Sequence, residues 1–185
     1  RAEEAGIAAL ALHGRTREDM YLNTARYDLI KEVKQLIRIP VVANGDIDRP
    51  EKAKYVLDYT GADAIMIGRA AQGRPWIFRE IAHYLETGEH LAAPSIQEVK
   101  EVLLGHLAEL YTFYGEYSGC RIARKHIAWY TKGLRSSNEF RQNMYKVEST
   151  TEQFKVVADY FDQLLIHGET MNDVQIEQVN LLETK

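Results

Sequence analysis

The sequence predicts a mixed fold, α/β followed by all-α, with parallel βα units first and an antiparallel bundle of helices after them. In residues 1–92, three short apolar runs are each followed by a polar turn and a segment with helical spacing. After Pro94 only helical periodicity remains, with short breaks between amphipathic segments. The chain has 185 residues, of which 45% are hydrophobic and 27% are charged. This composition excludes collagen-like, disulfide-rich and wholly disordered proteins.

The three apolar runs predict strands. A strand buried on both faces is expected over residues 7–12, a second over residues 41–43 and a third over residues 64–67. Apolar spacing predicts helices over residues 27–38 and 50–59, the latter stopped by a glycine at position 61. Strands joined by helices form a parallel sheet with right-handed crossovers. Because a complete (β/α)₈ barrel needs about 250 residues, three units indicate either a small open sheet or the end of a barrel.

The helical part divides into four predicted helices. The first begins at a capping box formed by Ser95 and Glu98, and a break is expected at Ser118 and Gly119. Further helices are expected over residues 121–134 and 136–145, and a last one begins at a cap in residues 149–152. The predicted domains are therefore residues 1–92 and 93–167, followed by a polar acidic tail over residues 168–185.

Polar and glycine residues follow all three predicted strands. Ligands of parallel α/β folds bind beyond the carboxyl ends of the strands, where glycine lets the backbone approach a ligand closely. An arginine at a helix start adds a cation that suits phosphate. The candidate ligand-binding residues are His13, Asn44, Gly45, Asp46, Gly68 and Arg69. The alternative is that the glycines are only turn residues. The histidines lack the spacing of metal ligands, so no metal site is predicted.

Positive charge is concentrated in residues 118–146. This segment has seven basic residues and one acidic residue, although the whole chain has a net charge of −4. Helical projection of residues 121–134 places four cations on one face: Arg121, Arg124, Lys125 and Lys132. Such a face with aromatic residues beside it suits an RNA backbone. The alternative is a solubilising face or a site for an acidic protein segment, including the acidic end of this chain.

Four segments resemble the tRNA-dihydrouridine synthase family, and the match is closest to its bacterial subfamily B. They are HGRT at residues 13–16, VANGDI at residues 42–47, GADAIMIGRAAQGRPWIF at residues 61–78 and RIARKHIAWY at residues 121–130. The resemblance covers residues 2–165. It implies that the chain is the C-terminal part of a (β/α)₈ TIM barrel followed by an antiparallel helical-bundle domain that binds tRNA.

The resemblance also implies an activity. Members of this family reduce the C5–C6 bond of a uridine in the tRNA D-loop, with FMN as cofactor and NADPH as electron donor. By position, Asn44, Gly45 and Asp46 would contact the flavin nucleotide, and Gly68 and Arg69 would lie at its phosphate. His13 would lie near the flavin ring or its phosphate side. The cations of residues 121–132 would face tRNA.

One departure from the family concerns the catalytic acid. The family's catalytic cysteine lies in the first half of the barrel, whereas the single cysteine here, Cys120, falls in the helical part. Cys120 is therefore expected to pack as a small apolar side chain. The chain begins at Arg1 rather than at a methionine, so we expect a fragment. Because the barrel half that carries the catalytic cysteine is missing, the fragment is expected to be inactive alone, and its open barrel edges are expected to favour self-association. The parent enzyme is expected to be monomeric.

The sequence also bears on the location of the protein and on other functions. A single cysteine, no apolar run near the length of a membrane span and no signal peptide together indicate a cytoplasmic protein. Two alternatives stay open. One is an RNA-binding module without redox chemistry, and the other is a barrel enzyme that acts on another phosphorylated small molecule.

Overall fold

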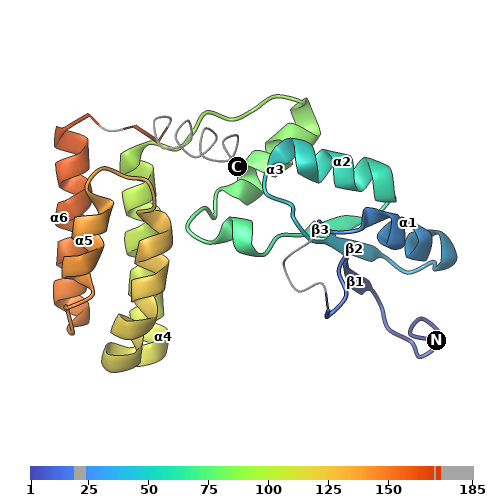
Figure 1. Ribbon diagram of the computed structural model, residues 1–185, viewed down its shortest axis with the longest axis horizontal. Helices are drawn as coiled ribbons and strands as arrows, with labels where there is room; N and C mark the ends of the chain where they lie inside the picture. The colour runs from blue at the N-terminus through green and yellow to red at the C-terminus, as the bar shows by residue number, and fades with distance from the viewer. Residues whose placement is uncertain (19–23, 169, 172–185) are drawn as a thin grey trace. The chain divides into compact units, whose positions relative to one another are not determined.

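The computed structural model describes residues 1–18, 24–168 and 170–171. The chain divides into two compact units, Arg1–Leu91 and Ala92–Lys185 (Figure 1). The predicted acidic tail, residues 168–185, lies almost entirely outside the described residues. Among the described helices, none combines the length and the hydropathy needed to cross a bilayer.

The first unit contains a parallel sheet of three strands in the order β1-β2-β3. They are β1 (Leu10–His13), β2 (Val41–Asn44) and β3 (Ala64–Met66). The predictions for β2 and β3 are confirmed to within one residue. The prediction for β1 is wrong at its start, which lies at Leu10 rather than at residue 7. Pairing between β1 and β2 begins at Leu10 and Val41, and the preceding Pro40 has no N–H with which to extend the ladder.

Helices follow the strands, as the spacing predicts. They are α1 (Tyr27–Leu36), α2 (Pro50–Thr60) and α3 (Ile77–Thr87), and a single 3₁₀ turn, η1 (Arg69–Ala71), lies between β3 and α3. Gly61 ends α2 in the left-handed conformation, and its N–H donates to the carbonyl oxygen of Leu57 at 2.9 Å. The predicted helix stop at this glycine is confirmed.

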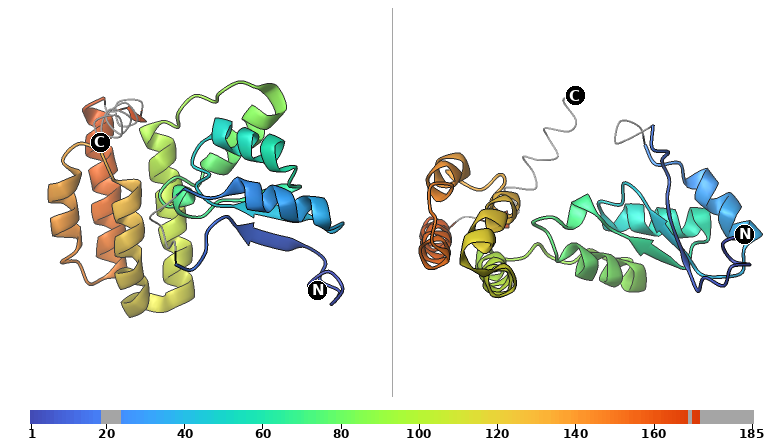
Figure 2. Two further views of the ribbon diagram at one scale, coloured as in Figure 1. Left: turned by 45° about the vertical axis from the view of Figure 1, so that its right-hand side comes forward. Right: turned by 90° about the horizontal axis from the view of Figure 1, so that it is seen from below.

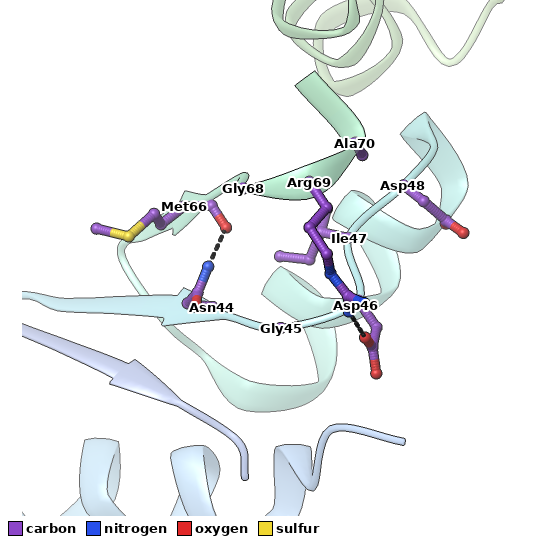
Figure 3. A pocket seen from close by; sticks show the side chains of 9 residues that line it. All are labelled: Asn44, Gly45, Asp46, Ile47, Asp48, Met66, Gly68, Arg69 and Ala70. Atoms are coloured by element: carbon purple, nitrogen blue, oxygen red, sulfur yellow. Dashed lines mark hydrogen bonds and ion pairs between the residues drawn. The ribbon is translucent and has the colours of Figure 1, made fainter. Parts of the chain in front are cut away.

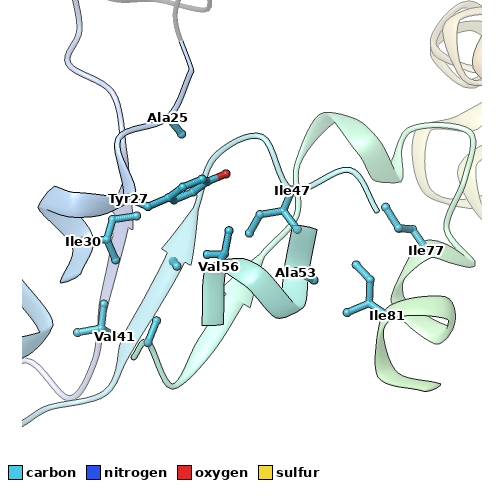
Figure 4. Packing of buried hydrophobic residues seen from close by; sticks show 11 residues of the cluster. Ala25, Tyr27, Ile30, Val41, Ile47, Ala53, Val56, Ile77 and Ile81 are labelled. Carbon is cyan, nitrogen blue, oxygen red and sulfur yellow. The ribbon is translucent and has the colours of Figure 1, made fainter. Parts of the chain in front are cut away.

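The helices cover one face of the sheet. Val41 and Ala43 of β2 are buried against Ile30 of α1 and Val56 of α2 in one apolar cluster (Figure 4). On the opposite face, alternate residues of the edge strands are exposed, and they include Ala11, Ala64 and Met66. The prediction that β1 is buried on both faces is therefore wrong, because none of the elements described in this unit, residues 1–18 and 24–91, covers the second face.

The second unit begins with α4 (Ile96–Tyr130), which folds back on itself. Gly115 has a φ of 73° and a ψ of 179°, a conformation that interrupts the helix and reverses the chain. The two arms that result lie side by side in Figure 1 and Figure 2. The ring centroids of His106 and His126, one from each arm, are 4.8 Å apart. The reversal lies at Gly115, so the predicted break at Ser118 and Gly119 is wrong.

Two further helices complete the second unit, α5 (Ser137–Met144) and α6 (Thr150–Ile166). Both predicted caps are confirmed, because the side chain of Ser95 accepts from the N–H of Glu98 and that of Ser149 from the N–H of Glu152. Buried Gln153 of α6 joins both arms of α4. Its Oε1 accepts from the Tyr111 hydroxyl at 2.7 Å, and its Nε2 donates to the carbonyl oxygen of Cys120 at 3.2 Å.

Candidate functional site

His13, Asn44 and Met66 are neighbours at the carboxyl ends of the three strands. They are register partners, His13 with Asn44 and Asn44 with Met66. Asn44 Nδ2 donates to the carbonyl oxygen of Met66 at 2.7 Å, so its Oδ1 is the atom that faces His13 Nδ1 at 2.6 Å. Because an amide oxygen only accepts, Nδ1 must carry the proton of this hydrogen bond. In the neutral ring, Nε2 is then the acceptor nitrogen.

Asp46 binds three donors from different parts of the first unit. Its Oδ2 accepts from Arg15 Nη2 at 2.6 Å and from the N–H of Ala25 at 2.8 Å, while Oδ1 accepts from Arg69 Nη2 at 3.2 Å. Burial alone would raise the pKa of Asp46. The hydrogen bond from Ala25 and the charge and hydrogen bond of Arg15 outweigh burial, and the pKa lies below its ordinary value. Asp46 is therefore an anion that positions two arginines.

Arg15 is a site residue that sequence reasoning missed. Its side chain is only 5% exposed, and the guanidinium forms an ion pair with Asp46. Arg15 lies two positions after His13 in the HGRT segment. This closeness to a predicted site residue was the only sequence feature that could have indicated its role. Its burial could not be read from the sequence, since arginine is mostly exposed in proteins.

The two glycines of the predicted site, Gly45 and Gly68, differ in the space around them. Gly45 has a φ of 126°, and a Cβ built on it would lie 2.7 Å from the Cβ of Ala25. Its carbonyl oxygen also accepts from the hydroxyl of buried Tyr27 at 2.6 Å. The chain's own packing thus requires glycine at position 45. A Cβ built on Gly68 would meet no protein atom within 4 Å, so the space in front of Gly68 is open.

A pocket of about 420 Å³ lies at the carboxyl edge of the sheet. Its volume is in the range of small-molecule sites. Five of the six predicted ligand-binding residues line it. The lining consists of Asn44, Gly45, Asp46, Ile47, Asp48, Met66, Gly68, Arg69 and Ala70 (Figure 3). His13 is absent from the lining but is hydrogen-bonded to Asn44.

Arg69 supplies positive charge at this pocket. Its side chain is 57% exposed, while one guanidinium nitrogen contacts Asp46. Because η1 is a single turn of three residues, a helix dipole can add little to anion binding here. The pocket therefore offers an anion mainly the guanidinium of Arg69 and the open backbone at Gly68.

The structure separates the four cations predicted to share one helix face. Arg121 and Lys125 are exposed on the second arm of α4. Arg124 is partly buried, and its Nη2 donates to the carbonyl oxygen of Val147 at 3.1 Å. Lys132 is exposed but follows the end of α4 at Tyr130, so the prediction of one helix over residues 121–134 is wrong.

Cys120 lies inside the second unit. The residue is 1% exposed, and its Sγ donates to the carbonyl oxygen of Val147 at 3.4 Å. Burial raises the pKa of this thiol. Cys120 thus packs as a small apolar group, as the sequence predicted. Over the described parts of the chain, no cluster of three His, Cys, Asp or Glu residues could hold a metal ion.

Comparison with known proteins places these residues in a family. Residues 1–165 match the family model described as dihydrouridine synthase. A protein named tRNA-dihydrouridine synthase B from Shewanella oneidensis is 58% identical over 164 residues, which cover 89% of this chain and 51% of the relative. A protein of the same name from Pseudomonas aeruginosa is 58% identical over 167 residues, 90% of this chain and 50% of the relative. The chain thus spans about half the length of the curated relatives it matches.

Proposed function

Since the chain belongs to the dihydrouridine synthase family, we propose that it takes part in the reduction of uridine to dihydrouridine in the tRNA D-loop. FMN is the proposed cofactor, NADPH the electron donor and the cytoplasm the location. The observation that carries the proposal is the pocket, where residues from the two strand-end segments that resemble the family, 42–47 and 61–78, come together. The names of the relatives state a tRNA-dihydrouridine synthase.

The pocket suits the phosphate end of FMN. Arg69 is accessible at the pocket, and its planar guanidinium can form paired hydrogen bonds with phosphate oxygens. Gly68 presents backbone with open space before it, where a phosphate group can approach closely. When bound, FMN supplies the hydride that the reduction requires.

The remaining residues of the pocket act by positioning. Asp46 contacts the guanidinium of Arg69 and forms an ion pair with the buried side chain of Arg15. Asn44 fixes the ring orientation of His13 and leaves Nε2 as its acceptor nitrogen when the ring is neutral. His13 can then accept a hydrogen bond from the cofactor or the substrate.

The two units have different proposed roles. The first unit is proposed as the C-terminal part of a (β/α)₈ barrel, and its uncovered sheet face supports this because a barrel strand packs on both faces. The second unit is proposed as an antiparallel helical-bundle domain that binds tRNA through Arg121, Lys125 and Lys132. Their exposure supports that role. Arg124 contributes through its contact with Val147, which positions the segment after α5.

The test of the pocket is FMN binding by Arg69→Ala, measured as a change in flavin fluorescence on titration. Loss of a charge-assisted contact of about 1.5–3 kcal/mol weakens binding by about 10- to 150-fold. Arg69→Lys should retain part of the affinity. The control is Lys54→Ala, an exposed cation on α2 that pairs with Asp58 rather than with the pocket. Equal FMN affinity in Arg69→Ala and the unchanged chain would contradict the proposal.

A further inference from the structure

An aromatic–cation stripe runs along the second arm of α4. It consists of Tyr117, Arg121, Lys125 and Trp129, which are spaced four residues apart and therefore lie on one side of the helix. The guanidinium carbon of Arg121 lies 5.4 Å from the ring centroid of Tyr117. Lys125 Nζ lies 5.8 Å from the ring centroid of Trp129. Each cation is thus paired with a ring at a cation–π distance.

The stripe is on the outer side of the helical unit. Tyr117 is 73% exposed, while Ala123 and Ile127 on the opposite side of the same arm are fully buried. The aromatic surface extends past the turn at Gly115, where Phe113 is 80% exposed and its ring centroid lies 4.8 Å from that of Tyr114. Exposed aromatic groups gathered in this way are typical of an interaction surface.

The charge of the stripe is positive. Over the described parts of the chain, no carboxylate forms an ion pair with Arg121 or Lys125. The adjacent acid, Glu116, is directed at α6, where it accepts from the N–H of Thr150 at 3.0 Å and from its hydroxyl at 3.1 Å. The two cations lie between the exposed ring of Tyr117 and the partly buried ring of Trp129. Such a surface is complementary to a polyanion that also presents flat apolar groups.

We propose that the aromatic–cation stripe binds unpaired nucleotides of an RNA, with a base stacked on Tyr117 and phosphates paired with Arg121 and Lys125. A surface of cations alone would suffice for an RNA duplex, whose stacked bases are out of reach. Exposed rings add affinity only where bases are splayed out, as in loops and at ends. The inference rests on the proposed function, which makes tRNA the partner, and it specifies that the contact falls on a loop.

The test compares three variants of the full chain with two RNAs, an unmodified tRNA transcript and a blunt duplex of similar base composition. Fluorescence anisotropy gives the affinities. Stacking of one base corresponds to a loss of about 5- to 150-fold, so Tyr117→Ala should weaken tRNA binding within that range and leave duplex binding unchanged. Tyr117→Phe keeps the ring and should bind like the unchanged chain. Lys125→Ala should weaken binding of both RNAs. It should also reduce the slope of the logarithm of the affinity against the logarithm of the salt concentration by about 1.

The control variant is Ile166→Ala, an exposed apolar residue at the end of α6 in the same unit, which should change neither affinity. If Tyr117→Ala binds tRNA as tightly as the unchanged chain while Lys125→Ala binds more weakly, the stacking inference is wrong but tRNA binding stands. If the unchanged chain binds neither RNA, the proposed tRNA contact itself fails. Displacement of tRNA by polyglutamate at equal charge would indicate an acidic protein partner and overturn the inference.

Discussion

At the scale of the residue, Asp46 is the side chain that organises the pocket. One carboxylate contacts the Arg15 guanidinium, the Arg69 guanidinium and the N–H of Ala25. Arg15 and Ala25 lie before β2, Asp46 follows β2 and Arg69 follows β3, so one anion ties three strand-end segments together. The position of the exposed arginine therefore depends on a residue that need not touch a ligand.

Asp46→Asn should destabilise the first unit and change how the stability of this unit depends on pH. The change removes the carboxylate charge that lies 2.6 Å from buried Arg15, at a cost of about 2 kcal/mol. The pKa of Asp46 is lower in the folded than in the unfolded state. The ionised carboxylate therefore adds its full contribution to the free energy of unfolding above about pH 4, and this contribution is lost as the pH falls through the folded-state pKa. Denaturant unfolding at pH 7 and pH 3 should show a larger difference between the two proteins at pH 7.

The matched control is Asp58→Asn, which removes a carboxylate from an exposed i, i+4 pair with Lys54. Its unfolding midpoint should stay close to that of the unchanged chain, because exposed pairs contribute little. Equal losses in Asp46→Asn and Asp58→Asn would refute the role given to Asp46.

Sequence reasoning located the pocket but not the roles of its residues. Five of the predicted residues line one cavity because strand ends of a parallel sheet converge whatever the details of packing. The requirement for glycine at position 45 comes from its positive φ and from Ala25, which lies 20 residues earlier. Neither contact nor dihedral angle has a sequence signature. The buried ion pair of Arg15 was hidden for the same reason.

At the scale of the element, the second unit depends on one glycine in α4. Gly115 combines a φ of 73° with a ψ of 179°, a region that is open almost only to glycine. Gly105 lies within the first arm of the same helix, and a Cβ on either glycine would meet no atom within 4 Å. The two positions therefore differ in backbone conformation and not in the space around them.

Gly115→Ala should destabilise the second unit by about 1–3 kcal/mol, because alanine is strained in this conformation. Gly105→Ala should instead stabilise it by about 0.5–1 kcal/mol, since alanine is the better helix former. Chemical denaturation followed by circular dichroism measures both changes. A loss of similar size in both variants would show that the backbone of Gly115 is not what limits substitution there.

The helix break predicted from the sequence, at Ser118 and Gly119, is not where the chain reverses. Ser118 and Gly119 look like a helix break, but Gly119 lies where the two arms touch. A Cβ on Gly119 would come within 3.2 Å of the Cα of Tyr111. A glycine required for close packing and a glycine required for a turn are alike in a sequence. Strands β2 and β3 and the helix stop at Gly61 were predictable because local signals alone determine them.

At the scale of the whole molecule, the chain holds a candidate cofactor pocket but no accessible thiol. Its single cysteine is buried and bonded to the carbonyl oxygen of Val147. The family resemblance implies a cysteine acid in the reduction, and the chain spans about half the length of its relatives. Because Cys120 is 1% exposed, we do not expect it to serve as that acid.

We expect the 185-residue chain with FMN, NADPH and tRNA to show no tRNA-dependent oxidation of NADPH. Absorbance of NADPH measures the rate, and dihydrouridine in the recovered tRNA provides a second readout. The full-length Shewanella oneidensis relative, assayed in parallel, is the positive control. Formation of dihydrouridine by the chain alone would contradict the expectation that the reduction needs an accessible cysteine.

The burial of Cys120 also gives the chain an internal reporter. A thiol-reactive dye can modify a side chain that is 1% exposed only after the second unit opens. The first unit has no cysteine, so its opening leaves no label. The rate of labelling, divided by the rate for a free thiol, therefore gives the population of molecules in which the helical unit is open, whatever the state of the first unit. This measurement needs no engineered residue and can be made without denaturant.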